Sequence, residues 1–391
     1  MPASRPVPAR VHCLAAARAQ FGGRMDRLLA GLERMDPLAD AAILALEGRP
    51  DGHAIVDAAV RGAVAPADLP PPLRELLASV ASFPAWVDWA RVDRGCHVFL
   101  RAGFAGGLVL GLRSLPYGYA APAGNKPLVF SGRLAERAPR RLAETARFVS
   151  AVAEPGALRR RDAGHAITLK VRLMHAQVRR LLLRSGRWDD ARWSAPINQH
   201  DMLATILLFS QVFLDGLRLL GLRVTAAEGD DFIHLWRVVG WLIGVDDDLL
   251  PDCERDARGW AEAILLTQGP PDDDSRALVA ALLHAPAQGA ATPAAQRQAA
   301  ARMRLARQLS RHLLGNELAD ALGIPAERPA LAAPILRTAL AGLDRARATL
   351  PALDRLAAAA GRRYWDNVIS LGLGDRAADF APPARLAREP G

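Results

Sequence analysis

The stretch from about 165 to 183 constrains the fold most, because its apolar residues recur every three to four positions. This spacing places them on one face of an α-helix. A helix with one apolar face buries that face against other elements, so the pattern predicts a packed helical core. The stripe consists of Val171, Met174, Val178, Leu181 and Leu182.

Other segments have the same helical pattern, and some carry start signals. Thr225 and Glu228 form a capping-box signature, Asn198 is suited to cap a helix, and Pro72 can begin one. The composition, 51% hydrophobic with only 5% aromatic residues, also favours helix over sheet. The sequence therefore predicts an all-α fold, with further helices at about 25–46, 96–112, 134–151, 201–220, 226–243, 256–268, 300–322 and 330–361.

Proline-rich and linker-like stretches suggest how the chain is divided. A proline-rich break covers 69–72, and an alanine- and proline-rich linker lies around 289–296. We expect a helical N-terminal segment at 1–70, a core at 71–260, and a C-terminal helical segment at 261–391 that packs on the core. The stretch 116–127 is expected to be a loop.

Three glycines lie inside the helix predicted at 96–112: Gly103, Gly106 and Gly107. Each weakens a helix by about 1 kcal/mol relative to alanine. Their presence makes sense where something approaches the backbone closely. A neighbouring helix or a flat cofactor would fit this requirement.

The charge pattern does not favour a nucleic-acid partner. The net charge of +9 comes almost wholly from arginine, since Lys126 and Lys170 are the two lysines of the chain. The arginines are spread along the sequence and mixed with acids, without the aromatic platform or basic arm of a nucleic-acid-binding protein. We therefore expect no nucleic acid as partner.

Cysteines, the N-terminus and the apolar runs bear on the compartment. Cys13, Cys96 and Cys253 lie far apart and form no CxxC or CxxCH motif, so neither a disulfide framework nor covalently attached haem is expected. The first twenty residues contain arginines and no apolar core of a signal peptide, which predicts a cytoplasmic protein. The longest apolar run, 102–112, is too short to span a bilayer, so no transmembrane segment is expected. The oligomeric state stays open.

His175 lies on the apolar face of the helix predicted at 165–183. At about 100° per residue, Val171 and Val178 fall within roughly 60° of it, and Arg172 and Arg179 flank the same face. A neutral imidazole on an apolar wall, with guanidinium groups for the propionates, is what a non-covalent haem requires. The alternative is a core histidine that bonds to a carbonyl.

The preceding predicted helix presents a second set of polar residues. Arg141 and Thr145 are four residues apart and share one face, and Glu144 neighbours both. A buried arginine and hydroxyl could orient O2 beside a haem. The alternative is an Arg–Glu pair on an exposed face, which contributes less than about 1 kcal/mol.

Two other histidines have weaker patterns. His234 follows Asp230 and Asp231 by about one turn, which could be a metal pair or a carboxylate-held base, or only compensation of the helix dipole. His200 and Asp201 lie at a helix start, where a cap is the commoner role.

Several motifs together resemble a known family, the catalytic domain shared by latex-clearing rubber oxygenases and the oxygenase of mycophenolic acid biosynthesis. The resemblance covers about 85–255 well and the remainder loosely. It rests on the ordered series Arg172-Leu173-Met174-His175-Ala176, Trp188-Asp189, Pro196-Ile197-Asn198-Gln199, Thr205, Phe209 and His234-Leu235-Trp236-Arg237-Val238-Val239-Gly240.

The resemblance implies a globin-like helical core that encloses one b-type haem, with additional helices at both ends. It makes His175 the proximal iron ligand and Arg141 and Thr145 the distal pair. This chain departs from the rubber oxygenases at Glu144, where they carry a lysine, and in the stretch 116–131. That stretch contains no acid here, whereas they use a glutamate there as a proposed base.

These observations lead to a haem b-dependent oxygenase that uses O2 on a small hydrophobic, possibly isoprenoid, substrate. We expect His175, Arg172 and Arg179 to bind the cofactor and Arg141, Thr145 and Glu144 to line the reacting side. Two alternatives remain at this point. One is a non-catalytic haem or lipid carrier, and the other is a structural helical protein with a buried histidine.

Overall fold

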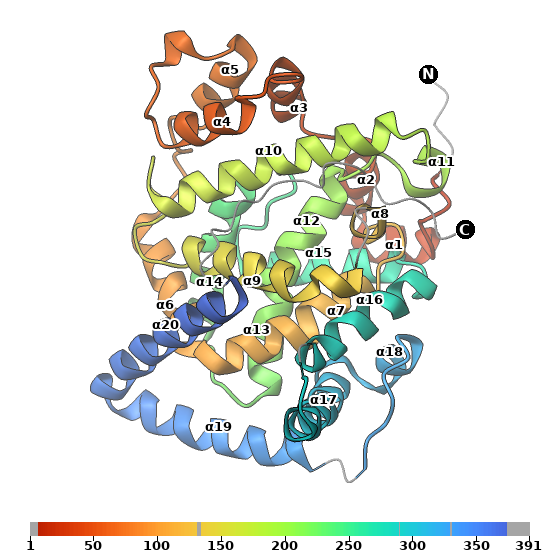
Figure 1. Cartoon of the computed structure of the whole chain (residues 1–391), viewed down its shortest axis with the longest axis vertical. Coiled ribbons are helices and arrows are strands. Elements are labelled where there is room, and N and C mark those ends of the chain that lie inside the picture. The colour runs from red at the N-terminus through yellow and green to blue at the C-terminus, as the bar shows by residue number, and fades with distance from the viewer. Residues whose placement is uncertain (1–6, 131–133, 289, 329–330, 374–391) are drawn as a thin grey trace.

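The computed structural model describes residues 7–130, 134–288, 290–328 and 331–373, and every regular element within these ranges is a helix (Figure 1). The predicted all-α class is therefore confirmed. The α-helices are α1 (Leu14–Phe21), α2 (Gly23–Gly31), α3 (Pro37–Ala45), α4 (Gly52–Val60), α5 (Pro71–Ser79), α6 (Trp89–Val109), α7 (Leu115–Tyr119), α8 (Lys126–Phe130), α9 (Leu134–Val152), α10 (Ala163–Arg184), α11 (Asp190–Trp193), α12 (Gln199–Phe209), α13 (Gln211–Leu219), α14 (Ala226–Leu242), α15 (Glu254–Thr267), α16 (Asp273–His284), α17 (Pro293–Leu314), α18 (Asn316–Ala321), α19 (Ala332–Thr349) and α20 (Pro351–Leu373).

Local cap signals placed several helix starts correctly. The Asn198 side chain accepts a hydrogen bond from the Asp201 amide at 2.9 Å. Thr225 and Glu228 form the reciprocal capping box at the start of α14. Each bond satisfies amides that the first turn of a helix leaves without a partner.

Other predicted boundaries need correction. The stretch 116–127 is not one loop, since α7 covers its beginning and α8 starts at Lys126; Pro116 fits because a first turn tolerates proline. The helix predicted at 201–220 breaks at Ser210, and the one predicted at 330–361 breaks before Pro351. The linker at 289–296 is shorter than expected, because α17 already begins at Pro293.

The glycines of α6 serve a neighbouring helix. A Cβ on Gly361 of α20 would lie 1.7 Å from the Leu100 carbonyl oxygen, and one on Gly103 would lie 2.9 Å from the Gly361 Cα. Gly103 also has a φ of 42°, which kinks α6 and suits glycine. Gly107 lies against the Tyr364 hydroxyl of the same helix. The close approach is therefore made by α20 and not by a cofactor.

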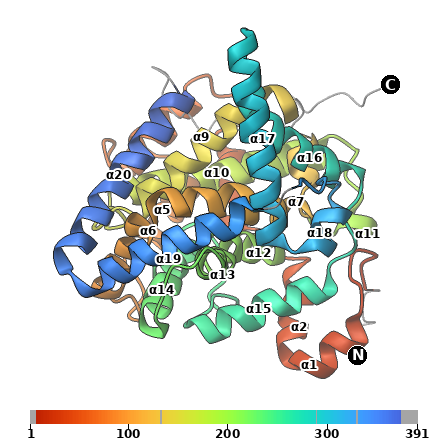
Figure 2. The ribbon, with the colours of Figure 1, turned by 90° about the horizontal axis from the view of Figure 1, so that it is seen from below.

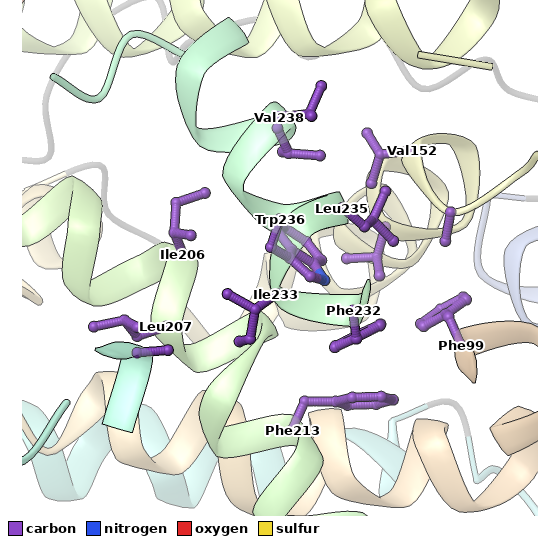
Figure 3. Close-up of a cluster of buried hydrophobic side chains, with 14 of the residues drawn as sticks. Phe99, Val152, Ile206, Leu207, Phe213, Phe232, Ile233, Leu235, Trp236 and Val238 are labelled. Carbon is purple, nitrogen blue, oxygen red and sulfur yellow. The ribbon is translucent and has the colours of Figure 1, made fainter. Parts of the chain in front are cut away.

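The main hydrophobic core is centred on α14, whose residues from 231 to 236 are all buried. Side chains from α6, α9, α12 and α13 meet Phe232, Ile233, Leu235 and Trp236 of this helix (Figure 3). Aromatic rings stack within the core, with 5.3 Å between the centroids of Phe213 and Phe232. Burial of this apolar surface is the main favourable term in the folding of the domain.

The two ends of the chain cover different sides of this core. Helices α3, α4 and α5 form a small second cluster that packs on α10 (Figure 1). Near the other end, α20 lies along α6 and α9, and α19 forms the lower edge of the molecule in Figure 1 and its front in Figure 2. Helices α16 to α18 build a third cluster beside α7.

Two apolar stretches, 89–119 and 199–219, have the length and composition of membrane spans. The fold buries 61% and 56% of their most apolar windows, respectively. Their apolar composition is accounted for by their positions in the core, as α6–α7 and α12–α13.

Candidate functional site

Helix α10 holds His175 on its inward face. Thr168, Val171 and Leu182 on the same side are buried. Burial lowers the pKa of His175 to about 4, and the nearby positive charge of Arg179 adds to this effect. The imidazole is therefore neutral at physiological pH, which is the form that ligates a metal.

The His175 imidazole makes no hydrogen bond to any described residue, and its Nδ1 is buried without a partner. The commoner role, a core histidine that bonds to a carbonyl, is thus not the one observed. The side chain is nevertheless only half-buried, although burial dominates its pKa. The neighbouring residues therefore do not enclose the imidazole completely.

Helix α12 supports this interpretation. It contacts α2, α7, α13, α14 and α15. Thr205 in its middle is nevertheless exposed, and its neighbours Ala204, Leu208 and Phe209 are half-buried. This apolar side of α12 is therefore not filled by the packing of its neighbours.

Two ion pairs, one buried and one with a half-buried aspartate, fasten α10 to the N-terminal segment. Asp36 accepts two hydrogen bonds from Arg172, from Nε at 2.7 Å and from Nη2 at 3.0 Å. Asp40 accepts one from Arg179 Nε at 2.8 Å. Arg179 Nη2 is buried without a partner, so this guanidinium still has one free donor.

The three polar residues that were predicted to line the reacting side all lie on α9, but they have different hydrogen-bond partners. Arg141 and Thr145 are half-buried and share a face with Phe148 and Val152, which belong to the core. Thr145 Oγ1 donates to the Arg141 carbonyl oxygen at 2.9 Å. Glu144 points to a different side and accepts from Arg140 Nε at 2.9 Å. The sequence suggested an Arg–Glu pair on this helix as an alternative, and the structure has the pair Arg140–Glu144.

His175 on α10 and Arg141 on α9 lie at comparable positions along their helices, counted from the point where the helices meet. The helices meet where a Cβ on Gly164 would lie 2.8 Å from the Ala151 carbonyl oxygen. From there they diverge (Figure 1). With a rise of about 1.5 Å per residue, His175 lies roughly 16 Å along α10 and Arg141 roughly 15 Å along α9. Both residues therefore lie at about the same distance from the point where the two helices meet.

Sequence reasoning missed Tyr119, which lies at the end of α7. Burial raises its pKa, and the positive charge of Arg141 is close enough to oppose the rise. The Asn125 side chain holds the Tyr119 carbonyl oxygen at 2.9 Å. A phenol thus accompanies Arg141 beside a stretch, 116–131, that lacks acids. The sequence feature that could have identified Tyr119 is its position as a tyrosine inside this stretch without acids.

The segment between α7 and α9 is tied to the C-terminal part of the chain. Lys126 is buried and forms ion pairs with Asp272, at 2.8 Å, and with Asp274. Asn125 donates to the Ser275 hydroxyl at 3.1 Å. Helix α16 therefore fixes the segment that leads into α9.

The weaker histidine patterns have structural roles. His234 Nε2 accepts from the Asp88 amide at 3.0 Å, and Asp231 binds Arg91 and Arg94. The Asp230 carboxylate accepts from the Glu254 amide at 2.8 Å. These contacts connect α14 to α6 and α15 and leave no free carboxylate–histidine pair.

His200 and Asp201 also have a structural role. Asp201 forms a double contact with Arg10, at 2.5 and 2.8 Å, and its Oδ1 lies 3.1 Å from His200 Nδ1. The positive charge of Arg10 holds the pKa of Asp201 well below its usual range despite burial. The pair therefore anchors the N-terminal segment on α12.

Neither metal clusters nor the described surface pockets involve this site. No group of three or more His, Cys, Asp or Glu side chains within the described ranges could hold a metal ion. Three surface pockets of about 410, 580 and 800 Å³ are lined by other residues than His175. A haem needs only an axial side chain, because the porphyrin supplies its other nitrogens. His175 meets that requirement.

Comparisons with known proteins show the family and the fold of the chain. Residues 94–345 match the family model described as the ER-bound oxygenase mpaB/B'/rubber oxygenase catalytic domain. A rubber oxygenase from Streptomyces sp. (strain K30) is 27% identical over 268 residues, which are 68% of this chain and 63% of that protein. The chain thus matches less than two thirds of that relative. The solved structure of latex clearing protein in its closed state superposes with a TM-score of 0.68 at 24% identity, covering 86% of this chain and 91% of that one.

Proposed function

The chain belongs to the family of the ER-bound oxygenase mpaB/B' and rubber oxygenase catalytic domains, and from this premise we propose that it is a haem b-dependent oxygenase. One observation carries the proposal. His175 is neutral, turned inward, only half-buried and without any hydrogen bond to a described residue. An unsatisfied imidazole of this kind is a costly feature in a core, and ligation of an iron would compensate for it.

A bound haem would supply the activation of O2. The chain supplies the surroundings. Helix α10 would hold the cofactor through His175, and Arg179 Nη2 is a free buried donor for a propionate. Arg172 stays a predicted propionate partner, but both of its bonds to Asp36 would have to be shared.

Arg141 and Thr145 are proposed to orient the reactants from α9. Arg141 can only donate hydrogen bonds. Thr145 uses its proton on the Arg141 carbonyl oxygen, so in this rotamer its hydroxyl can only accept a further bond. Tyr119 adds a neutral phenol next to Arg141. The three groups can position a polar reactant without adding a negative charge.

The proposed substrate is a hydrophobic, isoprenoid-like molecule that reacts with O2. The half-buried apolar side chains of Met174, Ala204 and Phe209 favour such a ligand. The name of the Streptomyces relative points to an isoprenoid polymer. We favour a smaller substrate for this chain, in line with the lack of an acid in 116–131.

The absorption spectrum of the purified protein tests the proposal. We expect a Soret band that His175→Ala abolishes. His165→Ala is the matched control, because His165 lies on the same helix and is also buried, with neither nitrogen hydrogen-bonded. That variant should retain the band. A wild-type protein that stays colourless after incubation with haem would refute the proposal.

A second candidate, a non-catalytic haem or lipid carrier, is favoured by one observation. Glu144 is held by Arg140 and the stretch 116–131 contains no acid, so the usual base for proton removal is missing. Uptake of O2 by the haem-loaded protein, measured with and without an isoprenoid, separates the two functions. A carrier shows no substrate-dependent uptake, whereas an oxygenase does.

A further inference from the structure

Charge is divided unevenly between α10 and the helices on its outer side. Helix α10 contains five basic residues and no acid, whereas the stretch 36–79, which comprises α3, α4 and α5, contains seven acids and three arginines. The chain as a whole has a net charge of +9. In Figure 1 this acidic stretch lies at the top of the molecule, on the side of α10 that faces away from the core. We call it the N-terminal cover.

Each basic side chain of α10 forms an ion pair with an acid of the N-terminal cover. The five pairs are Lys170–Asp57, Arg172–Asp36, Arg179–Asp40, Arg180–Glu47 and Arg184–Glu47. The Asp36 side chain is 3% exposed, but those of the other three acids are 31–44% exposed. Salt weakens ion pairs that water can reach much more than buried ones. The hold of the cover on α10 therefore depends on ionic strength.

The apolar contact between the cover and α10 is small. Helices α3, α4 and α5 build a core of their own, to which α10 contributes Leu173 and Ala176, 2% and 1% exposed. Among the helices of the body, α10 is the main one that α3 and α4 contact. Val60 and Val80 belong to the main core instead, so the cover stays attached along this edge. Separation of the cover from α10 thus leaves the main core intact, as in other sub-global openings.

The buried Arg172–Asp36 pair does not prevent such an opening. When a substitution removes one partner, the other charge stays buried without compensation. When the cover opens, both charges return to water together, and their hydration offsets the loss of the contact. The closed state is therefore favoured by several modest contributions. A change in a few surface pairs can shift the balance.

The ion pairs of the cover lie next to the proposed iron ligand. At about 100° per residue, Arg172 and Arg179 are roughly 60° and 40° from His175 around α10. Their partners, Asp36 and Asp40, both belong to the cover. Opening therefore releases α10 from the cover on the flank of His175, while α9 and α14 continue to contact the helix.

We propose that the N-terminal cover opens as a unit, that salt promotes the opening, and that its closure holds His175 in the position that ligates iron. The first two statements concern the chain alone. The third rests on the proposed function, because it requires a haem at His175. Exchange measurements on the protein without haem and haem transfer from the loaded protein separate failure of the cover from failure of haem binding.

Hydrogen–deuterium exchange of the full-length protein, followed by mass spectrometry, tests the opening. Between about 0.02 and about 0.5 M NaCl the Debye length falls from roughly 20 to roughly 4 Å. Amides of α3, α4 and α5 should exchange together and about 10-fold faster at the higher concentration, which is the effect expected from the loss of three exposed pairs. Amides of α12 and α14 in the main core should not change.

A single substitution separates the ion pairs from other effects of salt. Glu47→Gln removes the pairs with Arg180 and Arg184 and should speed exchange in the cover about 3-fold at low salt. Asp51→Asn is the matched control, because Asp51 forms its ion pair with Arg49 inside the cover. This variant should exchange like the wild type.

A charge swap tests whether the pairs join the two elements. Lys170→Glu brings two carboxylates together and should speed exchange in the cover, as should Asp57→Lys, which brings two ammonium groups together. The double variant restores an ion pair in reverse and should return exchange to within about 2-fold of the wild type. Lys170 is 22% and Asp57 44% exposed, so the swap leaves the core unchanged.

Transfer of haem from the loaded protein to apomyoglobin tests the third statement. Glu47→Gln should lose haem about 3-fold faster than the wild type, in proportion to the population of the open cover. Asp51→Asn should lose it at the rate of the wild type.

Different results would overturn different parts of the proposal. A cover that exchanges only as slowly as the main core, or that responds neither to salt nor to Glu47→Gln, would overturn the opening. Equal haem transfer from the wild type and from Glu47→Gln, with faster exchange of the cover in the variant, would overturn the link to His175. A protein that takes up no haem would refute the proposed function and with it the third statement, whereas the exchange results would still decide on the opening.

Discussion

Helices α10 and α9, which carry the two sets of proposed site residues, are held in place differently. Helix α10, which carries His175, is fastened by the buried Arg172–Asp36 pair, in which the side chains are 8% and 3% exposed. Helix α9 has its charged residues at the margin, as in the half-exposed Arg140–Glu144 pair. Its inward polar groups, Arg141 and Thr145, are only half-buried.

The difference suggests a division of labour. An iron ligand must keep its place, and buried ion pairs with good geometry resist distortion. Groups that orient a reactant must remain accessible to it, so they cannot be enclosed in the same way. In the proposed site, the side with His175 would thus serve to hold a position, and the side with Arg141 would serve to contact the reactant.

Breaking the Arg172–Asp36 pair should have the largest effect. Asp36→Asn leaves a buried guanidinium without its counter-charge and should lower the free energy of unfolding by about 3–5 kcal/mol, measured by urea denaturation. Glu47→Gln is the control, because Glu47 pairs with Arg180 and Arg184 of the same helix but at the surface. It should cost less than about 1 kcal/mol. Equal losses in the two variants would contradict the special role of the buried pair.

Removing Arg141 should affect activity and leave stability nearly unchanged. Arg141→Met is expected to reduce substrate-dependent O2 uptake by about 100-fold, equivalent to about 2.7 kcal/mol. Arg140→Met is the matched control, since Arg140 pairs with Glu144 away from the site, and it should keep its activity. If haem absorption is lost in Arg141→Met, the residue holds the cofactor and does not act on the reactant.

A smaller effect per residue should appear on mild acidification. Burial lowers the pKa of His165 and His175 in α10, and of His234 in α14, to about 4. Between pH 6.5 and 4 the unfolded chain binds protons at these residues that the folded protein does not, so stability falls as the pH falls. From pH 6.5 to 5.5 we expect each of these histidines to cost roughly 1 kcal/mol of stability in the apoprotein. His165→Gln should reduce the slope, and a flat profile would refute the neutral state of these histidines.

The features that sequence predicted correctly are those set by neighbouring residues. The 3.6-residue period predicted that His175 points inward. The N-cap Asn198 and the capping box of Thr225 and Glu228 predicted where two helices start. Each of these depends on residues within one or two helical turns.

The features that sequence did not predict depend on residues far apart in the chain. The partners of Arg172 and Arg179 are Asp36 and Asp40, about 140 positions earlier. The kink at Gly103 depends on α20, which approaches from the other end of the sequence. Local periodicity contains no information on contacts between residues that are far apart in the sequence. The role of Tyr119 was missed for the same reason, since it rests on Arg141 of another helix.

The crossing of α6 and α20 at Gly103 and Gly361 has a consequence for how the protein is made. Helix α6 emerges from the ribosome long before α20, and its narrow glycine surface must wait for that helix. Until then, the middle of the core is open on one side to other apolar segments. The interval between the synthesis of α6 and that of α20 is therefore the period in which the nascent chain is most vulnerable to aggregation.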